Sequence, residues 1–168
     1  MEMTIRPERS GDEGAIAALT RAAFHDAAHS SHTEQFIVAA LRRAGALSLS
    51  LVAEDDGQLL GHVALSPVTL SCGASGWYGL GPISVRPDRQ GQGIGRRLME
   101  AAIAWLEAQG AQGCVLLGEP AYYGRFGFEN YPELVLPGVP PEYFQALALA
   151  GAVPTGEVSY HPAFSATG

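Results

Sequence analysis

Apolar residues recur along the chain with two different spacings, and these predict alternating helices and strands. Residues 11–24 and 32–45 repeat apolar side chains at intervals of three and four, which is the spacing of one helix face. Residues 47–68 read instead as two strands around a turn at Asp55-Asp56-Gly57, because turn-forming residues separate two apolar runs. The helical spacing returns between Gly93 and Gln109, where it again marks one apolar face.

Shorter apolar stretches predict the rest of a sheet. Residues 79–85 form one expected strand, which ends at Arg86-Pro87, and residues 113–118 form another that is apolar throughout, as in a buried strand. The proline-rich last third adds four expected elements: a short helix over 119–126, a strand near Glu133–Leu136, a helix near Pro141–Ala148 and a strand near Gly156–Tyr160. This mixed order predicts a single domain over residues 1–168, of α/β or α+β class, with one central sheet.

Length and composition agree with one globular domain. The chain has 168 residues, of which 47% are hydrophobic and 16% are charged, enough to bury a sizeable core. No apolar run reaches the roughly 18 residues needed to cross a membrane, and the charged N-terminus lacks the apolar core of a signal peptide. Cys72 and Cys114 are too few for a disulfide framework or a zinc site. We therefore expect a cytoplasmic protein with no membrane partner.

The charged residues narrow the choice of partners. A net charge of −7 argues against general binding of nucleic acid, which needs a basic face. All ten basic residues are arginines, and the absence of lysine excludes a Schiff-base lysine and the lysine of a P-loop. Four of the arginines gather in one stretch: Arg86, Arg89, Arg96 and Arg97. Such a cluster on an acidic protein points to a bound anion, although for the cluster alone a solvated helix start is the simpler explanation.

Three glycines at alternate positions, Gly91, Gly93 and Gly95, lie where a predicted strand meets a predicted helix. The first N–H groups of a helix lack intrahelical partners and attract phosphate, and glycine lets the phosphate approach the backbone. The spacing differs from the G-x-G-x-x-G of dinucleotide-binding folds, and no lysine completes a Walker loop. The sequence therefore predicts a pyrophosphate site of another kind, unless the glycines only form a turn.

The stretch VRPDRQGQGIGRRLM resembles motif A of the GNAT superfamily of acetyltransferases, whose core is Q/R-x-x-G-x-G/A. Residues 90–95 fit that core without departure. The later stretch EPAYYGRFGF resembles a second motif of the family, in which a tyrosine, here Tyr123, stands four residues before a Gly-Phe pair. The resemblance runs from about residue 4 to about residue 130, and the tail resembles small bacterial members of uncharacterised substrate more weakly.

This resemblance implies a fold and a co-substrate. The fold is a central mixed β-sheet flanked by helices, in which two neighbouring parallel strands, Ile83–Val85 and Cys114–Gly118, splay apart and take the pantetheine arm of acetyl-CoA. The pyrophosphate is expected on the N–H groups of Gln92, Gly93, Gly95 and Arg96, with Arg96 and Arg97 toward the 3′-phosphate. The implied residues that bind acetyl-CoA are Ile83, Ser84, Val85, Gln90, Gly91, Gln92, Gly93, Ile94, Gly95 and Arg96.

The resemblance also implies a mechanism, in which an amine attacks the acetyl thioester directly and no covalent enzyme intermediate forms. The N–H of Val85 is expected to hold the oxyanion, and Tyr123 is expected to protonate the leaving thiolate. Tyr122 is the alternative acid, and Tyr123 has an alternative role as a packing aromatic. These assignments rest on the family motifs and not on spacing alone.

Polar residues between the first two predicted helices add candidates on the acceptor side. In the resembled family this region borders the acceptor pocket, so His25, His32 and Glu34 are expected to bind substrate, although a surface loop is the simpler interpretation. The base that removes the ammonium proton is left open among Glu34, Glu119 and His32, and a favourable contact with a helix dipole explains Glu119 without catalysis. His25, His29 and His32 fall at i, i+4 and i+7, but no H-E-x-x-H motif accompanies them, so we expect no metal.

Two classes of function follow from the motifs. The first is an acetyl-CoA-dependent N-acetyltransferase that acts on the primary amine of a small molecule or peptide, and the acidic balance of the chain favours a cationic acceptor. The second is a non-catalytic module of the same fold that binds acyl-CoA for regulation. Tyr123 at its motif position favours the enzyme. A homodimer is expected only by analogy with the family.

Overall fold

The computed structural model describes residues 3–27 and 30–168 of the chain. The contacts divide the chain into two compact units. Unit 1 consists of Met1–Ser66, Gly81–Ala102 and Pro162–Gly168, and unit 2 consists of Pro67–Leu80 and Ile103–His161. Each unit holds at least one buried apolar cluster of its own, and the expectation of a single domain stays a prediction.

Unit 1 is built on antiparallel strands. Strands β1 (Thr4–Pro7), β2 (Leu49–Asp55), β3 (Gln58–Pro67) and the second half of β5 (Trp77–Val85) lie in this order. β2 and β3 form the predicted hairpin, and the turn residues Asp56 and Gly57 have φ angles of 51° and 78°. Two positive φ angles in succession match the twist of a two-residue hairpin, so this part of the prediction is confirmed.

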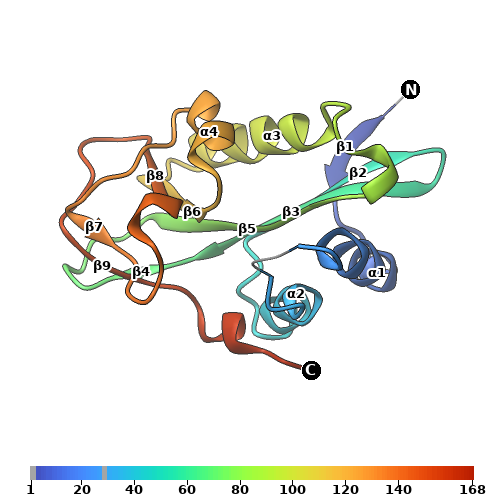
Figure 1. The fold of residues 1–168 in the computed structure, drawn as a ribbon, viewed down its shortest axis with the longest axis horizontal. Coiled ribbons are helices and arrows are strands. Elements are labelled where there is room, and N and C mark those ends of the chain that lie inside the picture. Colours follow the sequence, from blue (N-terminus) through green and yellow to red (C-terminus); the bar gives the residue numbers. More distant parts are fainter. Residues whose placement is uncertain (1–2, 28–29) are drawn as a thin grey trace. The chain divides into compact units, whose positions relative to one another are not determined.

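Three helices cover the two faces of these strands. Helices α1 (Glu13–Phe24) and α2 (Glu34–Arg43) lie side by side on one face, and the start of α3 (Ile94–Ala108) lies on the other (Figure 1). One buried cluster on the first face consists of Ile16, Val38 and Val52. On the other face, a Cβ at Gly61 would lie 2.8 Å from Leu98 Cδ1, so glycine at this position lets α3 pack closely. The three helices confirm those predicted from the apolar spacing.

The end of the chain returns to unit 1. A 3-10 turn over Pro162–Ser165 brings Ala163 into a buried cluster with Ile37 and Leu41 of α2. The last residues therefore extend the core on the α2 side.

Unit 2 contains a mixed sheet and a second, smaller sheet. The first half of β5 pairs in parallel with β6 (Gly113–Leu117), and β6 pairs antiparallel with β8 (Phe144–Ala148). The smaller sheet has the order β4 (Thr69–Leu70), β9 (Gly156–Ser159) and β7 (Leu134–Val135). Its main apolar cluster consists of Val68, Leu70, Trp77, Val115, Leu134, Phe144, Ala146 and Val158. The structure thus confirms the strands predicted at 113–118, Glu133–Leu136 and Gly156–Tyr160.

The predicted helix near Pro141–Ala148 is wrong. A 3-10 turn covers Pro141–Tyr143, and Phe144–Ala148 forms strand β8. Alanine and leucine in this stretch favour a helix locally, but β6 offers an edge with which every residue of β8 pairs. Gln145 adds to this pairing, since its Nε2 donates to Gly118 O at 2.9 Å. Pairing with a distant strand therefore overrides local propensity. Sequence analysis also did not predict the short strands β1 and β4.

The two cysteines have opposite surroundings. Cys114 is buried in β6, and burial raises the pKa of its thiol. Cys72 is exposed in the turn after β4. Neither forms a disulfide.

Candidate active site

The predicted phosphate site lies between β5 and α3. A 3-10 turn over Pro87–Arg89 follows β5, and Gly91 and Gly93 then have φ angles of 77° and 84°. Glycine adopts such angles without strain, so both positions favour it. A Cβ at either glycine would meet no heavy atom within 4 Å. The space over this loop is open, as the approach of a phosphate to the backbone requires.

The start of α3 presents backbone donors to the same loop. The first helical hydrogen bond runs from Arg97 N–H to Gly93 O at 3.1 Å, which leaves the N–H groups of residues 94–96 without an intrahelical partner. The side chain of Gln90 donates to Val85 O at 3.3 Å and ties the loop to the end of β5. The loop therefore has both the donors and the anchoring that an anion site needs.

At least two arginines of the cluster make contacts within the protein. Arg86 pairs with Asp88 at 2.7 Å, and Arg97 donates to Met3 O at 3.3 Å. Arg96 is exposed in the first turn of α3. Arg96 therefore adds an exposed positive charge to the first turn of α3, whereas the guanidinium of Arg86 is held by a neighbouring carboxylate.

The strand segment Ile83–Val85 alternates in burial. Ser84 is buried, whereas Ile83 and Val85 are half-buried. Side chains alternate between the faces of a strand, so the predicted contact of Ser84 with pantetheine rests on its backbone. The buried Ser84 hydroxyl makes no hydrogen bond with any residue that the structure describes.

Tyr123 is the last residue of the short helix α4 (Pro120–Tyr123), which continues as a 3-10 turn over Gly124–Phe126, as predicted. Its ring packs on Gly118, where any Cβ would overlap the ring. Burial raises the pKa of Tyr123 to about 12, so its hydroxyl keeps its proton at neutral pH. A phenol in this state can donate a proton but cannot serve as a base.

Tyr122, the alternative acid, takes part in packing. The guanidinium of Arg125 lies 4.6 Å from the centre of its ring, and the rings of Tyr123 and Phe126 meet it edge-on at 4.9 and 5.7 Å between centroids. The carbonyl of Glu119 accepts the N–H groups of both tyrosines, while its side chain is exposed and makes no capping hydrogen bond. Tyr122 is thus part of a packed aromatic cluster, and Glu119 contributes to this turn through its backbone.

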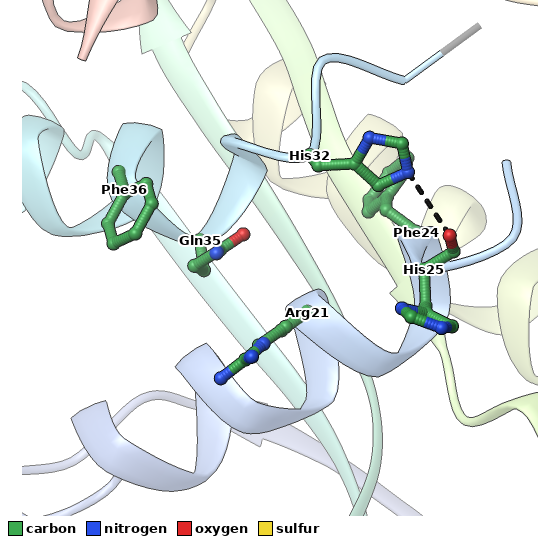
Figure 2. A pocket seen from close by; sticks show the side chains of 6 residues that line it. All are labelled: Arg21, Phe24, His25, His32, Gln35 and Phe36. Atoms are coloured by element: carbon green, nitrogen blue, oxygen red, sulfur yellow. Dashed lines mark hydrogen bonds between the residues drawn. The ribbon is translucent and has the colours of Figure 1, made fainter. Parts of the chain in front are cut away.

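A pocket of about 510 Å³ lies between α1 and α2. It is lined by Arg21, Phe24, His25, His32, Gln35 and Phe36 (Figure 2). His32 has a φ angle of 61°, and its Nε2 lies 3.1 Å from His25 O, which holds the ring at the pocket. Of the three predicted substrate residues, His25 and His32 line the pocket. Glu34 does not, and its carboxylate accepts from Ser30 Oγ at 2.7 and 2.8 Å.

Most of the residues in this pocket were not predicted from the sequence. Arg21 is exposed on α1 and forms no ion pair with any residue in the described part of the chain. Phe24 and Phe36 occupy apolar positions of their helices. Spacing alone does not distinguish a phenylalanine of the core from one at a pocket, so no signal in the sequence singles them out.

No metal site is found within residues 3–27 and 30–168, because no three histidine, cysteine, aspartate or glutamate side chains there could hold an ion. His29 lies outside the described residues. In the same part of the chain, no helix is long and apolar enough to cross a membrane.

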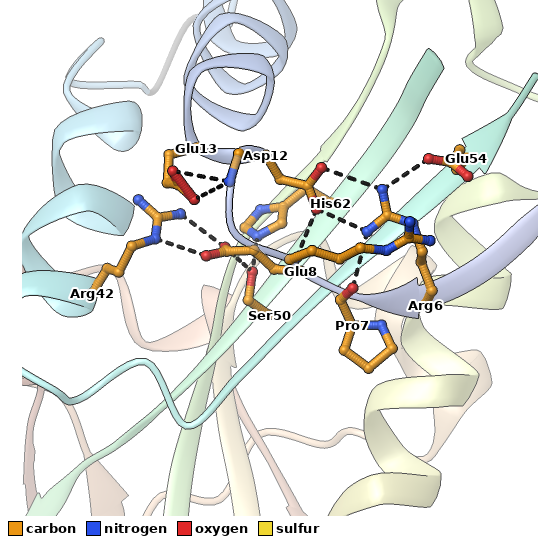
Figure 3. Close-up of polar contacts among 11 residues, drawn as sticks. Arg6, Pro7, Glu8, Asp12, Glu13, Arg42, Ser50, Glu54 and His62 are labelled. Atoms are coloured by element: carbon orange, nitrogen blue, oxygen red, sulfur yellow. Dashed lines mark hydrogen bonds and ion pairs between the residues drawn. The ribbon is translucent and has the colours of Figure 1, made fainter. Parts of the chain in front are cut away.

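A row of polar side chains crosses unit 1 on the face covered by α1 and α2 (Figure 3). His62 of β3 is fully buried, and its Nε2 lies 2.8 Å from Ser50 Oγ. Ser50 donates to Glu8 at 2.6 Å, and Arg42 donates twice to the same carboxylate at 2.8 Å. Burial alone would raise the pKa of Glu8, but the hydrogen bonds from Arg42 and Ser50 outweigh it and the pKa is lowered. Glu8 is therefore ionised at neutral pH.

The buried His62 should make stability depend on pH. Burial lowers its pKa from the ordinary value of 6.5 to about 4, so the unfolded chain takes up this proton at a higher pH than the folded one. The unfolded state then binds more protons, and stability is lost as the pH falls. We expect the free energy of unfolding to decrease by about 3 kcal/mol between pH 6.5 and pH 4, as measured by denaturant titration at closely spaced pH values.

The acidic groups change the stability of the protein at a lower pH than His62 does. The pKa of Asp12 is lowered to about 2 by its hydrogen bond from Arg6, and the pKa values of Glu8 and Glu54 lie below 4.5. A His62→Gln variant should therefore flatten the curve above pH 4.5 and leave the steeper fall below it. An unchanged slope above pH 4.5 in that variant would contradict the prediction.

Comparison with known proteins places the chain among acetyltransferases. Residues 14–128 match the family model described as the acetyltransferase (GNAT) family. The chain is 41% identical over 128 residues to the uncharacterised N-acetyltransferase YhbS of Escherichia coli (strain K12), and the match covers 76% of this chain and 74% of that protein.

Two solved structures resemble the chain over nearly its whole length. One is a GNAT family acetyltransferase from Brucella melitensis in complex with acetyl-CoA, with 51% identity, a TM-score of 0.88 and coverage of 98% of this chain and 99% of that one. The other is YhbS from Escherichia coli in complex with CoA, with 38% identity, a TM-score of 0.89 and coverage of 100% and 94%. These similarities confirm the predicted fold class, a mixed sheet flanked by helices.

Proposed function

Because the chain belongs to the acetyltransferase (GNAT) family, we propose that it transfers the acetyl group of acetyl-CoA to a primary amine by direct attack in a ternary complex. The observation that carries this proposal is the open loop before α3, with its two glycines at positive φ and the unpartnered N–H groups of the helix start. The relatives solved with acetyl-CoA and with CoA support the same donor for this chain.

The residues around the loop suit acetyl-CoA. The N–H groups of residues 94–96 would bind its pyrophosphate, and the exposed Arg96 would add a positive charge. The backbone of Ile83 and Val85 would bond the amides of pantetheine, as a strand binds an added strand. Acetyl-CoA supplies the reaction with an acetyl group activated as a thioester.

Two groups of the chain have roles at the reacting atoms in this proposal. Val85 N–H would donate to the acetyl oxygen, where negative charge develops as the amine attacks. Tyr123 would give its proton to the departing sulfur, and its raised pKa keeps that proton in place until then. The roles of Glu34, Glu119 and His32 as candidate bases stay predictions.

The pocket between α1 and α2 is the proposed acceptor site. Its volume of about 510 Å³ is in the range of small-molecule sites. Arg21 brings a positive charge to this pocket, while Phe24 and Phe36 offer apolar contact. The local charge therefore favours an acceptor with an anionic group beside its amine, in contrast to the cationic acceptor expected from net charge alone.

Release of CoA thiol over a panel of primary amines tests this function. The panel should pair amines that carry a carboxylate with matched amines that lack it. We expect turnover with at least one primary amine, and faster turnover for the carboxylate member of its pair. Tight binding of acetyl-CoA without turnover of any amine would instead support the non-catalytic module that binds acyl-CoA.

A further inference from the structure

The surroundings of His62 determine which of its nitrogens carries the proton. Its Nε2 lies 2.8 Å from Ser50 Oγ, and the single hydroxyl proton of Ser50 is donated to Glu8 at 2.6 Å, because an ionised carboxylate only accepts. His62 must therefore donate from Nε2, which leaves Nδ1 with a lone pair (Figure 3). Arg42 keeps Glu8 in place with two hydrogen bonds. The neutral imidazole is thus oriented with a proton acceptor at Nδ1.

Ser84 on the neighbouring strand stands opposite His62. Arg86 N–H donates to Leu60 O at 2.8 Å, and Ser84 O lies 3.1 Å from the place of a Cβ on Gly61. In an antiparallel pair with this register, Ser84 faces His62 and their side chains share one face of the sheet. Both are at most 2% exposed.

His62 Nδ1 and Ser84 Oγ are both buried without a hydrogen-bond partner among the described residues. Two polar atoms on one buried face suit an ordered water, which needs two or more polar partners. Ser84 lies between Ile83 and Val85, whose backbone is proposed to hold the acetyl donor. A water at this point would therefore stand beside the strand on which the reaction is proposed to occur.

The surroundings of His62 keep its imidazole unprotonated in the resting protein. Burial lowers the pKa of His62 to about 4, so its imidazole is neutral at neutral pH. The charged groups that act on it are Glu8, which directly follows β1, and Arg42 on α2, and within the described chain no other charge contributes. Protonation at Nδ1 would give an imidazolium that Glu8 stabilises through the hydroxyl of Ser50.

Resting on the proposed function, we propose that His62 accepts the proton of the acceptor ammonium at Nδ1, through a water held with Ser84 Oγ. This proton leaves before the attack, so the nitrogen lone pair is free to form the bond to the acetyl carbon. A second proton leaves the nitrogen after the attack and replaces the proton that Tyr123 gives to the sulfur. The products are the amide, the CoA thiol and a protonated His62, which returns its proton to bulk water. Ser50 and Glu8 are positioning residues in this scheme.

A Ser50→Ala variant tests the proposal, with Ser50→Thr as the matched control that keeps the hydroxyl. The assay follows kcat/KM for one alkylamine from near-neutral pH up to the pKa of that amine. We expect Ser50→Ala to be about tenfold slower at neutral pH, where the amine is protonated, and to approach the wild type as the amine loses its proton in solution. Ser50→Thr should follow the wild type throughout, and acetyl-CoA affinity should be the same in all three proteins.

A deficit of Ser50→Ala that is the same at every pH, or no deficit at all, would overturn the role of His62 while leaving acetyl transfer intact. Absence of turnover by the wild type with every amine would overturn the proposed function itself. Nitrogen-15 NMR of the histidine rings gives a readout that needs no activity. At neutral pH the proton of His62 is expected on Nε2, and a proton on Nδ1 would overturn the proposal whatever the kinetics show.

Discussion

Replacement of Tyr123 by phenylalanine is expected to lower kcat by about 100-fold or more and to leave the affinity for acetyl-CoA unchanged. Phenylalanine keeps the ring that packs on Gly118 and that lies 6.5 Å from the ring of Phe128, so the change removes little besides the hydroxyl. The lost hydroxyl is the proposed source of the proton for the departing sulfur. Thiol release measures kcat, and calorimetry measures the dissociation constant of acetyl-CoA.

Tyr122→Phe is the matched control, because the neighbouring ring keeps its contacts with Arg125 and Phe126 in that variant. Its kcat should change by no more than about threefold. The reverse pattern, with Tyr122→Phe slow and Tyr123→Phe normal, would assign the acid to Tyr122. A Gly118→Ala variant tests the same role in another way. Its methyl group would push the ring of Tyr123 aside, so kcat should fall although the hydroxyl is still present.

Replacement of Gly93 by valine is expected to weaken acetyl-CoA binding by about tenfold or more. The φ angle of 84° is strained for a β-branched residue, and the side chain would occupy the open space over the loop. A phosphate could then no longer approach the N–H groups at the start of α3. Isothermal titration of acetyl-CoA measures the effect, and circular dichroism shows whether the variant is folded.

A Gly73→Val variant is the control that separates the effect of backbone strain from the loss of the phosphate site. Gly73 has a φ angle of 83°, and a Cβ on it would meet no heavy atom within 4 Å, but it lies in the turn after β4, outside the loop. Valine there should cost similar stability and leave acetyl-CoA affinity unchanged. Equal affinity of Gly93→Val and wild type would remove this loop from the proposed phosphate site.

The parts of the fold that depend on neighbours in sequence could be predicted. The β2–β3 hairpin follows from Asp56 and Gly57, and α3 follows from apolar spacing that begins after Gly93. The glycine loop is also local, because the φ angles at Gly91 and Gly93 are properties of a few residues. Sequence motifs likewise sufficed to identify the family.

Features that join distant segments could not be predicted. Strand β8 forms because Phe144–Ala148 meets the edge of β6, and nothing within that stretch indicates this pairing. His62 acquires its orientation from Ser50 on β2 and from Glu8 just after β1, and Arg21 gains its place at a pocket only when α1 meets α2. The assignments of individual site residues, the homodimer and the cytoplasmic location stay predictions.

The contrast between the two cysteines has a practical consequence for any thiol-reactive dye used to follow CoA. Exposed Cys72 reacts at once and contributes a fixed offset for each chain, whereas buried Cys114, with its raised pKa, does not react while the protein is folded. The signal of the dye over time therefore reports three quantities. Its initial value gives the protein concentration, its slope gives the rate of CoA release, and reaction of a second protein thiol indicates unfolding.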